Sequence, residues 1–206
     1  MNPDLPLTAL ASLRQATRPM HDRIETVMSG LPISESTMLA AHLRVHGDGL
    51  SRALDSSPAT AALAGRFLPL REYANLIHDD HLALTGQRAA AIEAPHVALE
   101  TGDDPAAGLG IVYVVTGSFL GLRALDRMAD GALSMQSRYI HAVTTEGVNA
   151  WQTLLRALRA HDDDPASCRA ICQAATTVFE AYLSRSIHEL TLARERPAHP
   201  LDEKSR

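Results

Sequence analysis

A histidine and a glutamate lie four residues apart in RPMHDRIETVM, the stretch that spans residues 18–28. Helical residues at this spacing share a face, so the Glu25 carboxylate can accept a hydrogen bond from one nitrogen of the His21 imidazole. An imidazole held in this way can bind a metal ion through its other nitrogen. Arg14 and Arg18 precede it on the same helix and can pair with carboxylates of a ligand. An ordinary half-buried histidine in an ion pair fits the same residues.

A second segment, GIVYVVTGSFLGLRAL, contains glycines within a helical pattern. Each interior glycine costs a helix about 1 kcal/mol relative to alanine. Gly117 and Gly121 are four residues apart, so one helix face lacks side chains in two successive turns, and a flat ligand can lie against the backbone there. Close packing of two helices is the other explanation of these glycines.

The two segments together meet the needs of a haem site. Haem binds where an axial ligand meets one face, a closely approaching surface meets the other, and cations lie near the propionates. His21 would supply the ligand, the Gly117/Gly121 face the second surface, and the arginines the cations. The sequence therefore predicts haem binding with His21 as the axial ligand of the iron.

These segments resemble the haem oxygenases, in particular the bacterial, biliverdin-producing branch that often accompanies bacteriophytochromes. LRQATRPMHDRIE resembles the proximal helix of the family, YVVTGSFLGLRAL resembles its distal helix, and the similarity continues through GVNAWQTLLRALRAH. The resemblance implies that His21 is the proximal ligand and that Glu25 is its hydrogen-bond partner. It assigns the propionates to three arginines: Arg14, Arg18 and Arg156.

On the distal helix, the resemblance implies that Gly117 and Gly121 let the backbone approach the haem. Ser118 occupies the position of an aspartate in animal members, so protons are expected to arrive through ordered water rather than from Ser118 as an acid. Two positions depart from the usual pattern, since Thr116 replaces a glutamate and Leu122 replaces a glycine. Because of these departures, a protein that binds haem or another ligand without turnover stays open as an alternative.

The activity implied by the resemblance is cleavage of haem, with O2 and external electrons, to biliverdin, CO and Fe2+. Haem is then both substrate and cofactor. The sequence has no flavin or nicotinamide fingerprint, so we expect a separate electron-donor protein such as a ferredoxin or a flavodoxin. The use of the products stays open between supply of biliverdin to a bacteriophytochrome and release of iron.

Two histidine pairs keep a non-haem helical metalloenzyme open as a further alternative. His42 and His46 are four residues apart, and His78 and His81 enclose two aspartates in HDDH. Such a site would need further Glu or His ligands at matching spacing on partner helices. We expect His78 and His81 to lie on a solvated polar face instead.

The composition is that of a soluble globular domain. The 206 residues are 46 % apolar and 21 % charged, with a net charge of −5. This mild acidity argues against a nucleic-acid partner. No signal peptide is visible and the longest apolar run is too short to cross a bilayer, so we expect a cytoplasmic protein without a membrane partner. Cys168 and Cys172 are expected to be small buried thiols.

Helical periodicity dominates the chain and predicts an all-α, single-domain haem oxygenase-like multi-helix bundle. The domain is expected over residues 1–196, and residues 197–206 are expected to be a disordered tail. Helices are predicted at about residues 8–29, 34–54, 70–91, 105–130, 144–158 and 165–196.

Local signals support several of these boundaries. Ser34 can cap the second helix, and Gly47 and Gly49 indicate a break inside it. Asp–Pro pairs predict helix starts at Pro105 and Pro165, because proline is favoured in the first turn.

Overall fold

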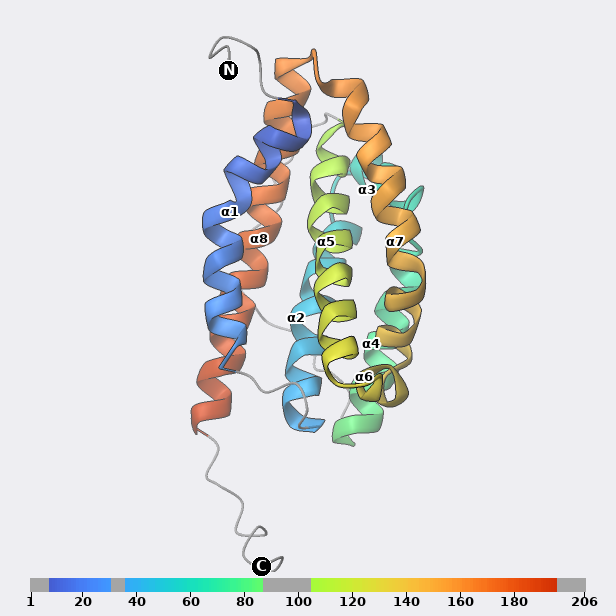
Figure 1. Ribbon diagram of the computed structural model, residues 1–206, viewed down its shortest axis with the longest axis vertical. Coiled ribbons are helices and arrows are strands. Elements are labelled where there is room, and N and C mark those ends of the chain that lie inside the picture. The colour runs from blue at the N-terminus through green and yellow to red at the C-terminus, as the bar shows by residue number, and fades with distance from the viewer. Residues whose placement is uncertain (1–7, 31–35, 87–104, 196–206) are drawn as a thin grey trace, which may run out of the picture.

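The computed structural model describes residues 8–30, 36–86 and 105–195. Within these ranges the chain forms α-helices and no strand, which confirms the predicted all-α bundle. The elements are α1 (Ala9–Met28), α2 (Ser36–Leu54), α3 (Pro58–Gly65), α4 (Leu70–Thr85), α5 (Ala107–Met128), α6 (Ala132–Gln136), α7 (Arg138–Leu158), the 3-10 turn η1 (Arg159–His161) and α8 (Pro165–Glu195) (Figure 1).

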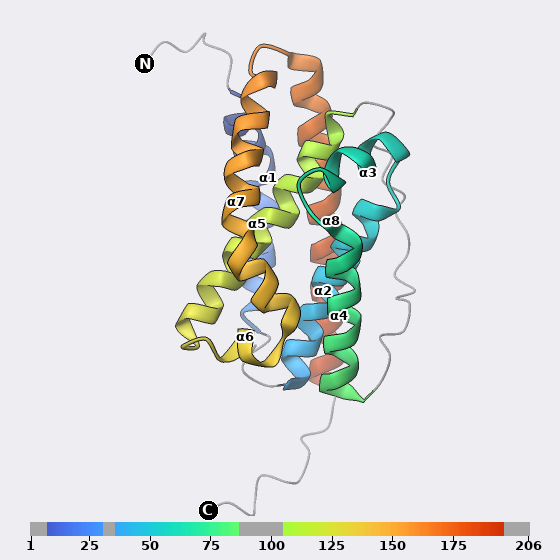
Figure 2. The same ribbon diagram turned by 90° about the vertical axis from the view of Figure 1, so that its right-hand side faces the viewer.

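Helix α8 is the longest element, at 31 residues, and runs along most of the bundle (Figure 1). Helices α1, α2 and α5 pack against it, α7 packs against α5, and α4 packs against α2 (Figure 2). Helices α1 and α5 both rest on α8 but have hardly any direct contact with each other. The helix with the predicted ligand and the helix with the predicted glycine face therefore lie across from one another.

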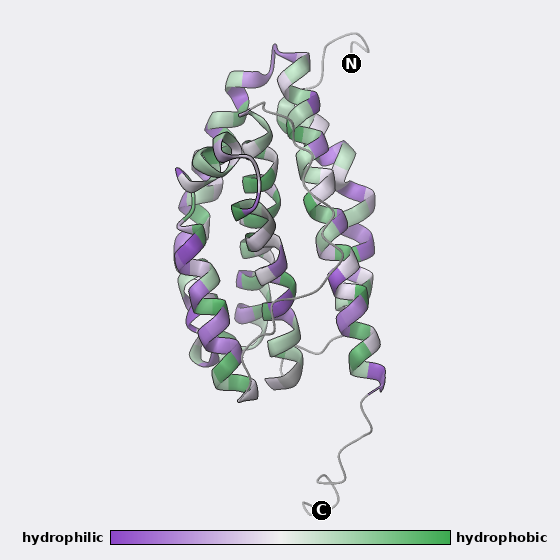
Figure 3. Cartoon of the chain, turned by 180° about the vertical axis from the view of Figure 1, so that it is seen from behind, coloured by the Kyte–Doolittle hydropathy of each residue, from purple (hydrophilic) through white to green (hydrophobic). Residues whose placement is uncertain are grey.

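Helix α5 is the central helix of the hydrophobic core. Nearly all of its first nine residues are buried, whereas the outer helices carry hydrophilic and hydrophobic residues in alternation (Figure 3). By length and composition, α5 is the one helix in the described part of the chain that is able to cross a membrane. More than half of its apolar window is buried between the other helices, as is typical of the core helix of a bundle.

Capping side chains set several helix boundaries. The Thr8 hydroxyl accepts a backbone N–H at the start of α1, and the Asp164 carboxylate accepts two at the start of α8. Helix α4 ends at Thr85, six residues before the predicted end, and Gly86 caps it with a φ of 69°. The predicted cap at Ser34, residues 87–91, the Asp104 start signal and the tail lie outside the described residues.

The predicted break in α2 is wrong, because the helix continues through Gly47 and Gly49. At Gly49 an added Cβ would lie 2.0 Å from the ring of Tyr182 in α8. This glycine therefore permits close packing between α2 and α8 rather than a break.

The predicted start of α7 near residue 144 is also wrong, because the helix begins at Arg138. Ser137 caps it by accepting the Ile140 N–H at 3.0 Å. Asp80 of α4 then accepts the Ser137 hydroxyl at 2.7 Å and the Tyr139 N–H at 2.8 Å. A carboxylate from a distant segment thus satisfies the free N–H groups of this helix start.

Candidate functional site

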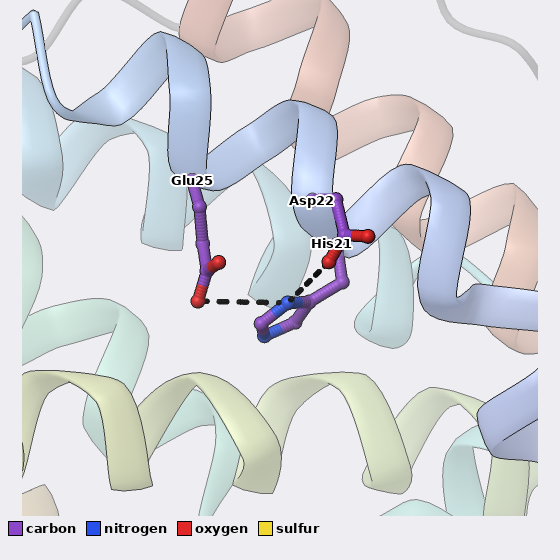
Figure 4. Close-up of side chains that lie close together, drawn as sticks. All are labelled: His21, Asp22 and Glu25. Atoms are coloured by element: carbon purple, nitrogen blue, oxygen red, sulfur yellow. Dashed lines mark ion pairs between the residues drawn. The ribbon is translucent and has the colours of Figure 1, made fainter.

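His21 projects from α1 toward α5, and one of its two ring nitrogens faces carboxylates of its own helix (Figure 4). Nδ1 lies 3.6 Å from Glu25 Oε1 and 4.0 Å from Asp22 Oδ1, which are ion-pair distances rather than hydrogen bonds. The side chain is 53 % exposed, and Phe179 of α8 lies edge-on to it with the ring centroids 6.2 Å apart. The other nitrogen points away from α1 toward the ribbon of α5. A ligand can therefore reach it from solvent.

The glycines of α5 form two groups with different surroundings. At Gly110 an added Cβ would lie 2.1 Å from a backbone oxygen of α8, and at Gly108 it would lie 3.0 Å from α3, so these two permit close helix packing. At Gly117 the added Cβ would meet Trp151 of α7 at 4.0 Å, and at Gly121 it would meet no described atom within 4 Å. The Gly117/Gly121 face is thus accessible, and close packing does not account for it.

The three predicted propionate arginines are all on the surface. Arg18 Nε lies 3.0 Å from Asp22 Oδ1, in a pair whose side chains are both largely exposed. Arg156, in the last turn of α7, donates to Thr153 Oγ1 at 3.2 Å. Arg14 is exposed on α1. Exposed pairs of this kind contribute about 0–1 kcal/mol, so these side chains can turn toward an anionic ligand at little cost.

Ser118 belongs to a buried polar cluster that could not be predicted from the sequence. His46 Nδ1 is 3.4 Å from Ser118 Oγ and 3.2 Å from Tyr139 Oη. The His46 ring also packs edge-on against Tyr182, with the centroids 5.9 Å apart. Ser118 Oγ donates to the Val115 carbonyl at 2.7 Å. We call the four residues from α2, α5, α7 and α8 the Ser118 cluster: His46, Ser118, Tyr139 and Tyr182.

Burial decides the protonation states within the Ser118 cluster. It lowers the pKa of His46 to about 3, with a further contribution from nearby His42, so His46 is neutral at physiological pH. Burial also raises the pKa values of Tyr139 and Tyr182. Ser118 is near enough to offset part of the rise in the Tyr182 pKa, but the buried Tyr182 hydroxyl makes no hydrogen bond to a described residue. The cluster is therefore uncharged, and its Tyr182 hydroxyl is a hydrogen-bond donor without an acceptor among the described residues.

The two departures from the family pattern do not project from the Gly117/Gly121 face. Leu122 is 3 % exposed and belongs to the hydrophobic core. Thr116 is fully buried, and its hydroxyl donates to the Val112 carbonyl of its own helix at 2.6 Å. The glycine face is consequently as open as it would be without these two substitutions.

The expectation that His78 and His81 share a solvated polar face is wrong for His81. His81 and neighbouring Asp80 are each 4 % exposed. His81 Nε2 is 2.6 Å from Nη1 of Arg44, whose guanidinium also binds the buried Glu189 of α8. The histidine faces the bundle interior because α4 packs against α2 along that side.

Among the described residues, neither of the two histidine pairs belongs to a group of three or more potential metal ligands. In the described part of the chain, one group of three His, Cys, Asp or Glu side chains has its ligand atoms within 4.8 Å of one another. It consists of His21, Asp22 and Glu25. Cys168 and Cys172 are free and half-buried, and burial raises the pKa of both thiols. Such thiols are poor nucleophiles and poor metal ligands.

Comparison of the chain with models of protein families, with curated proteins and with solved structures finds no match.

Proposed function

We propose that this chain is a haem oxygenase, which cleaves haem to biliverdin, CO and Fe2+ with O2 and electrons from a ferredoxin- or flavodoxin-type donor protein. The observation that carries the proposal is the placement of His21. Its Nδ1 faces Glu25 and Asp22, and its other nitrogen is directed at a helix with an accessible glycine face (Figure 4). An imidazole whose second nitrogen is turned to a carboxylate is the usual arrangement for a metal-binding histidine.

The described residues fit a haem group in three respects. A flat ligand needs a surface without side chains, and Gly121 provides space where no atom lies within 4 Å. It needs apolar contacts beside the axial ligand, and Phe179 lies edge-on to His21. It needs cations at a solvent-exposed edge, and Arg14, Arg18 and Arg156 are on the surface.

In the proposed reaction, haem supplies the iron that activates O2 and is also the molecule that is opened. His21 holds the group from one side, and Glu25 orients the imidazole and makes it a better electron donor. Gly117 and Gly121 allow a close approach from α5. Ser118 is part of the hydrogen-bonding surface there, and its own proton is used in a bond to a backbone carbonyl. It therefore orders water rather than acting as an acid.

Titration of the purified chain with ferric haem tests the binding step. We expect a Soret band and 1:1 binding in the wild type, and a His21→Ala variant that loses both the spectrum and at least about tenfold in affinity, or 1.4 kcal/mol. His141→Ala is the matched control, because His141 is an exposed histidine on α7. A His21→Ala variant with the spectrum and affinity of the wild type would contradict the ligand assignment.

Addition of ferredoxin, its reductase and NADPH to the haem complex tests turnover. We expect the Soret band to decay and biliverdin to appear, and the biliverdin isomer identifies the carbon that is attacked. A Soret band that persists under these conditions would contradict the proposed activity. It would favour the alternative, a protein that binds haem without turnover. Failure to bind haem at all would contradict both.

A further inference from the structure

The aromatic rings of Tyr113 and Trp151 lie at one end of the Gly117/Gly121 face and bear on how a flat ligand is placed on α5. We propose that Trp151 is a positioning residue for this ligand: its indole forms an end wall of the face and packs against the edge of the bound macrocycle. The identity of the macrocycle as haem rests on the proposed function. The contact itself can be tested with a flat molecule that contains no iron.

Tyr113 lies at the start of the accessible face of α5. Of the residues from Ala107 to Thr116, Tyr113 alone is not buried. Gly117 and Gly121 follow it four and eight residues later, and residues at these spacings share one face of a helix. Gly117 is half-buried and Gly121 is exposed, so exposure increases along this face. The end at Tyr113 is therefore its enclosed end.

Trp151 of α7 covers this enclosed end. Its Cζ3 lies 4.0 Å from the position of a Cβ added at Gly117, which is an ordinary van der Waals distance. The ring of Tyr113 lies beside it, with the ring centroids 5.5 Å apart and the planes at 38°. This separation is typical of interacting aromatic pairs, so each ring holds the other in place. Because Trp151 is only half-buried, part of its indole is accessible to a ligand.

The start of α1 is attached to the same end of the bundle. The Ala9 N–H donates to Asp162 Oδ1 at 2.8 Å, and Asp162 directly follows the turn η1 after α7. Helix α1 therefore contacts α7 at the end where α1 and α5 begin and α7 ends (Figure 1). A flat ligand held by His21 is bounded on this side and has space on the side of Gly121.

An indole at this place limits how far the macrocycle can move along α5. Tryptophan provides a large, rigid contact surface at a low cost in side-chain entropy, because only two torsion angles must be fixed. In the proposed reaction, the seating of the ring on α5 decides which of its meso carbons lies next to Gly117. Trp151 thus acts on the position of the ring and takes no part in the oxygen chemistry.

The contact can be observed directly, because the chain contains a single tryptophan. In a 15N-labelled sample, the indole N–H of Trp151 gives the one tryptophan side-chain signal. We expect metal-free protoporphyrin IX to displace this signal in the wild type, because the ring current of a porphyrin acts at short range. His21→Ala should show the same displacement, since the probe has no iron to bind. An indole signal that stays in place, or a protein that does not bind protoporphyrin, would overturn the proposal.

Two substitutions distinguish an end wall from mere packing between α5 and α7. Trp151→Leu keeps apolar bulk without a ring, and we expect it to weaken haem binding about tenfold, or about 1.4 kcal/mol. Trp151→Phe keeps a ring and should weaken binding by less than about threefold. Phe67→Leu is the matched control, because Phe67 is a half-buried aromatic residue in the turn between α3 and α4, and it should leave the affinity unchanged. Wild-type affinity in Trp151→Leu would overturn the proposal.

The cyanide complex of ferric haem shows whether the ring has moved, because its haem methyl signals in 1H spectra depend on the orientation of the ring relative to the axial histidine. We expect Trp151→Leu to change the pattern of these signals or to add a second set, and Phe67→Leu to keep the wild-type pattern. An unchanged pattern in Trp151→Leu would overturn the positioning role and leave the proposed function intact. Absence of haem binding in the wild type would overturn the proposed function, whereas the contact of Trp151 with a flat ligand is decided by protoporphyrin.

Discussion

At the scale of single residues, two glycines of one helix have opposite roles. Gly110 lies where α5 presses against α8, and an added Cβ would be 2.1 Å from the Ile171 oxygen. Gly121, three turns later, has no described atom within 4 Å of that position. Neither has a positive φ that would require glycine. The first glycine is needed for the fold, and the second has no structural need that the bundle itself explains.

Alanine at these two positions should therefore have opposite effects. Gly121→Ala should raise the free energy of unfolding by up to about 1 kcal/mol, because alanine is the better helix former, and should weaken haem binding by crowding the open face. Gly110→Ala should destabilise the fold, because neither backbone can yield. Urea unfolding and haem titration measure the two effects. A Gly121→Ala variant that gains stability and binds haem as the wild type does would remove Gly121 from the site.

The sequence could predict the local geometry within each helix of the candidate site, but not what surrounds it. The spacing of His21 and Glu25, and that of Gly117 and Gly121, is a local property of a helix, and both pairs share a face as expected. The Ser118 cluster could not be predicted, because His46 and Tyr139 are brought together only by the packing of four helices. The only signal was the i, i+4 pair of His42 and His46, which suggested metal ligation instead.

A pH dependence of stability follows from the buried His46. Its pKa falls from 6.5 to about 3 on folding, so the unfolded chain binds an extra proton between these values. The contribution to stability is present above pH 6.5 and is lost as the pH falls toward 3. At pH 5 it amounts to a loss of about 2 kcal/mol relative to pH 7. Urea unfolding at pH 7 and pH 5 measures this loss in the wild type and in His46→Gln. The loss in free energy of unfolding should be smaller in the variant by about this amount. Equal losses would contradict the assignment of the pH dependence to His46.

At the scale of elements, the start of α7 depends on a residue of α4. Asp80 accepts hydrogen bonds from Ser137 and Tyr139 and faces Arg138 Nε at 3.4 Å. This explains why the helix begins earlier than the periodicity indicates, and why Tyr139 is fixed where it meets His46. Sequence alone could not reveal it, because the partner lies 57 residues away.

Removal of this cap should destabilise the bundle. Asp80→Ala leaves two buried donors without an acceptor, which costs about 1–3 kcal/mol for each unsatisfied group, so we expect a loss of at least 2 kcal/mol in urea unfolding. Asp79→Ala is the matched control, because Asp79 pairs with Arg138 on the surface at 3.0 Å, and should change stability by less than about 1 kcal/mol. Similar losses in the two variants would contradict the capping role.

At the scale of the whole molecule, a buried ionic network connects α2, α4 and α8. Glu189 of α8 is 1 % exposed and binds both Arg44 of α2, at 2.8 Å from Nε, and Arg185, at 2.7 Å from Nη2. Arg44 extends the network to His81 of α4. Burial lowers the pKa of Arg185, and the charge of Glu189 raises it again in part. Helices α1 and α5 both pack against α8. The network therefore stabilises the helix that supports the two helices of the candidate site.

Neutralising Glu189 should therefore affect the fold and leave the site chemistry unchanged. Glu189→Gln leaves two buried guanidinium groups without their counter-charge, and breaking a buried pair from one side costs about 3–5 kcal/mol. We expect a loss of this size in urea unfolding. Glu180→Gln, the same change at an exposed position of the same helix, should cost less than about 1 kcal/mol. Without urea, both variants should retain the wild-type haem spectrum, because neither residue is among those assigned to haem binding. A spectrum altered in Glu189→Gln alone would mean that α8 sets the distance between α1 and α5 through this network, and not through apolar packing.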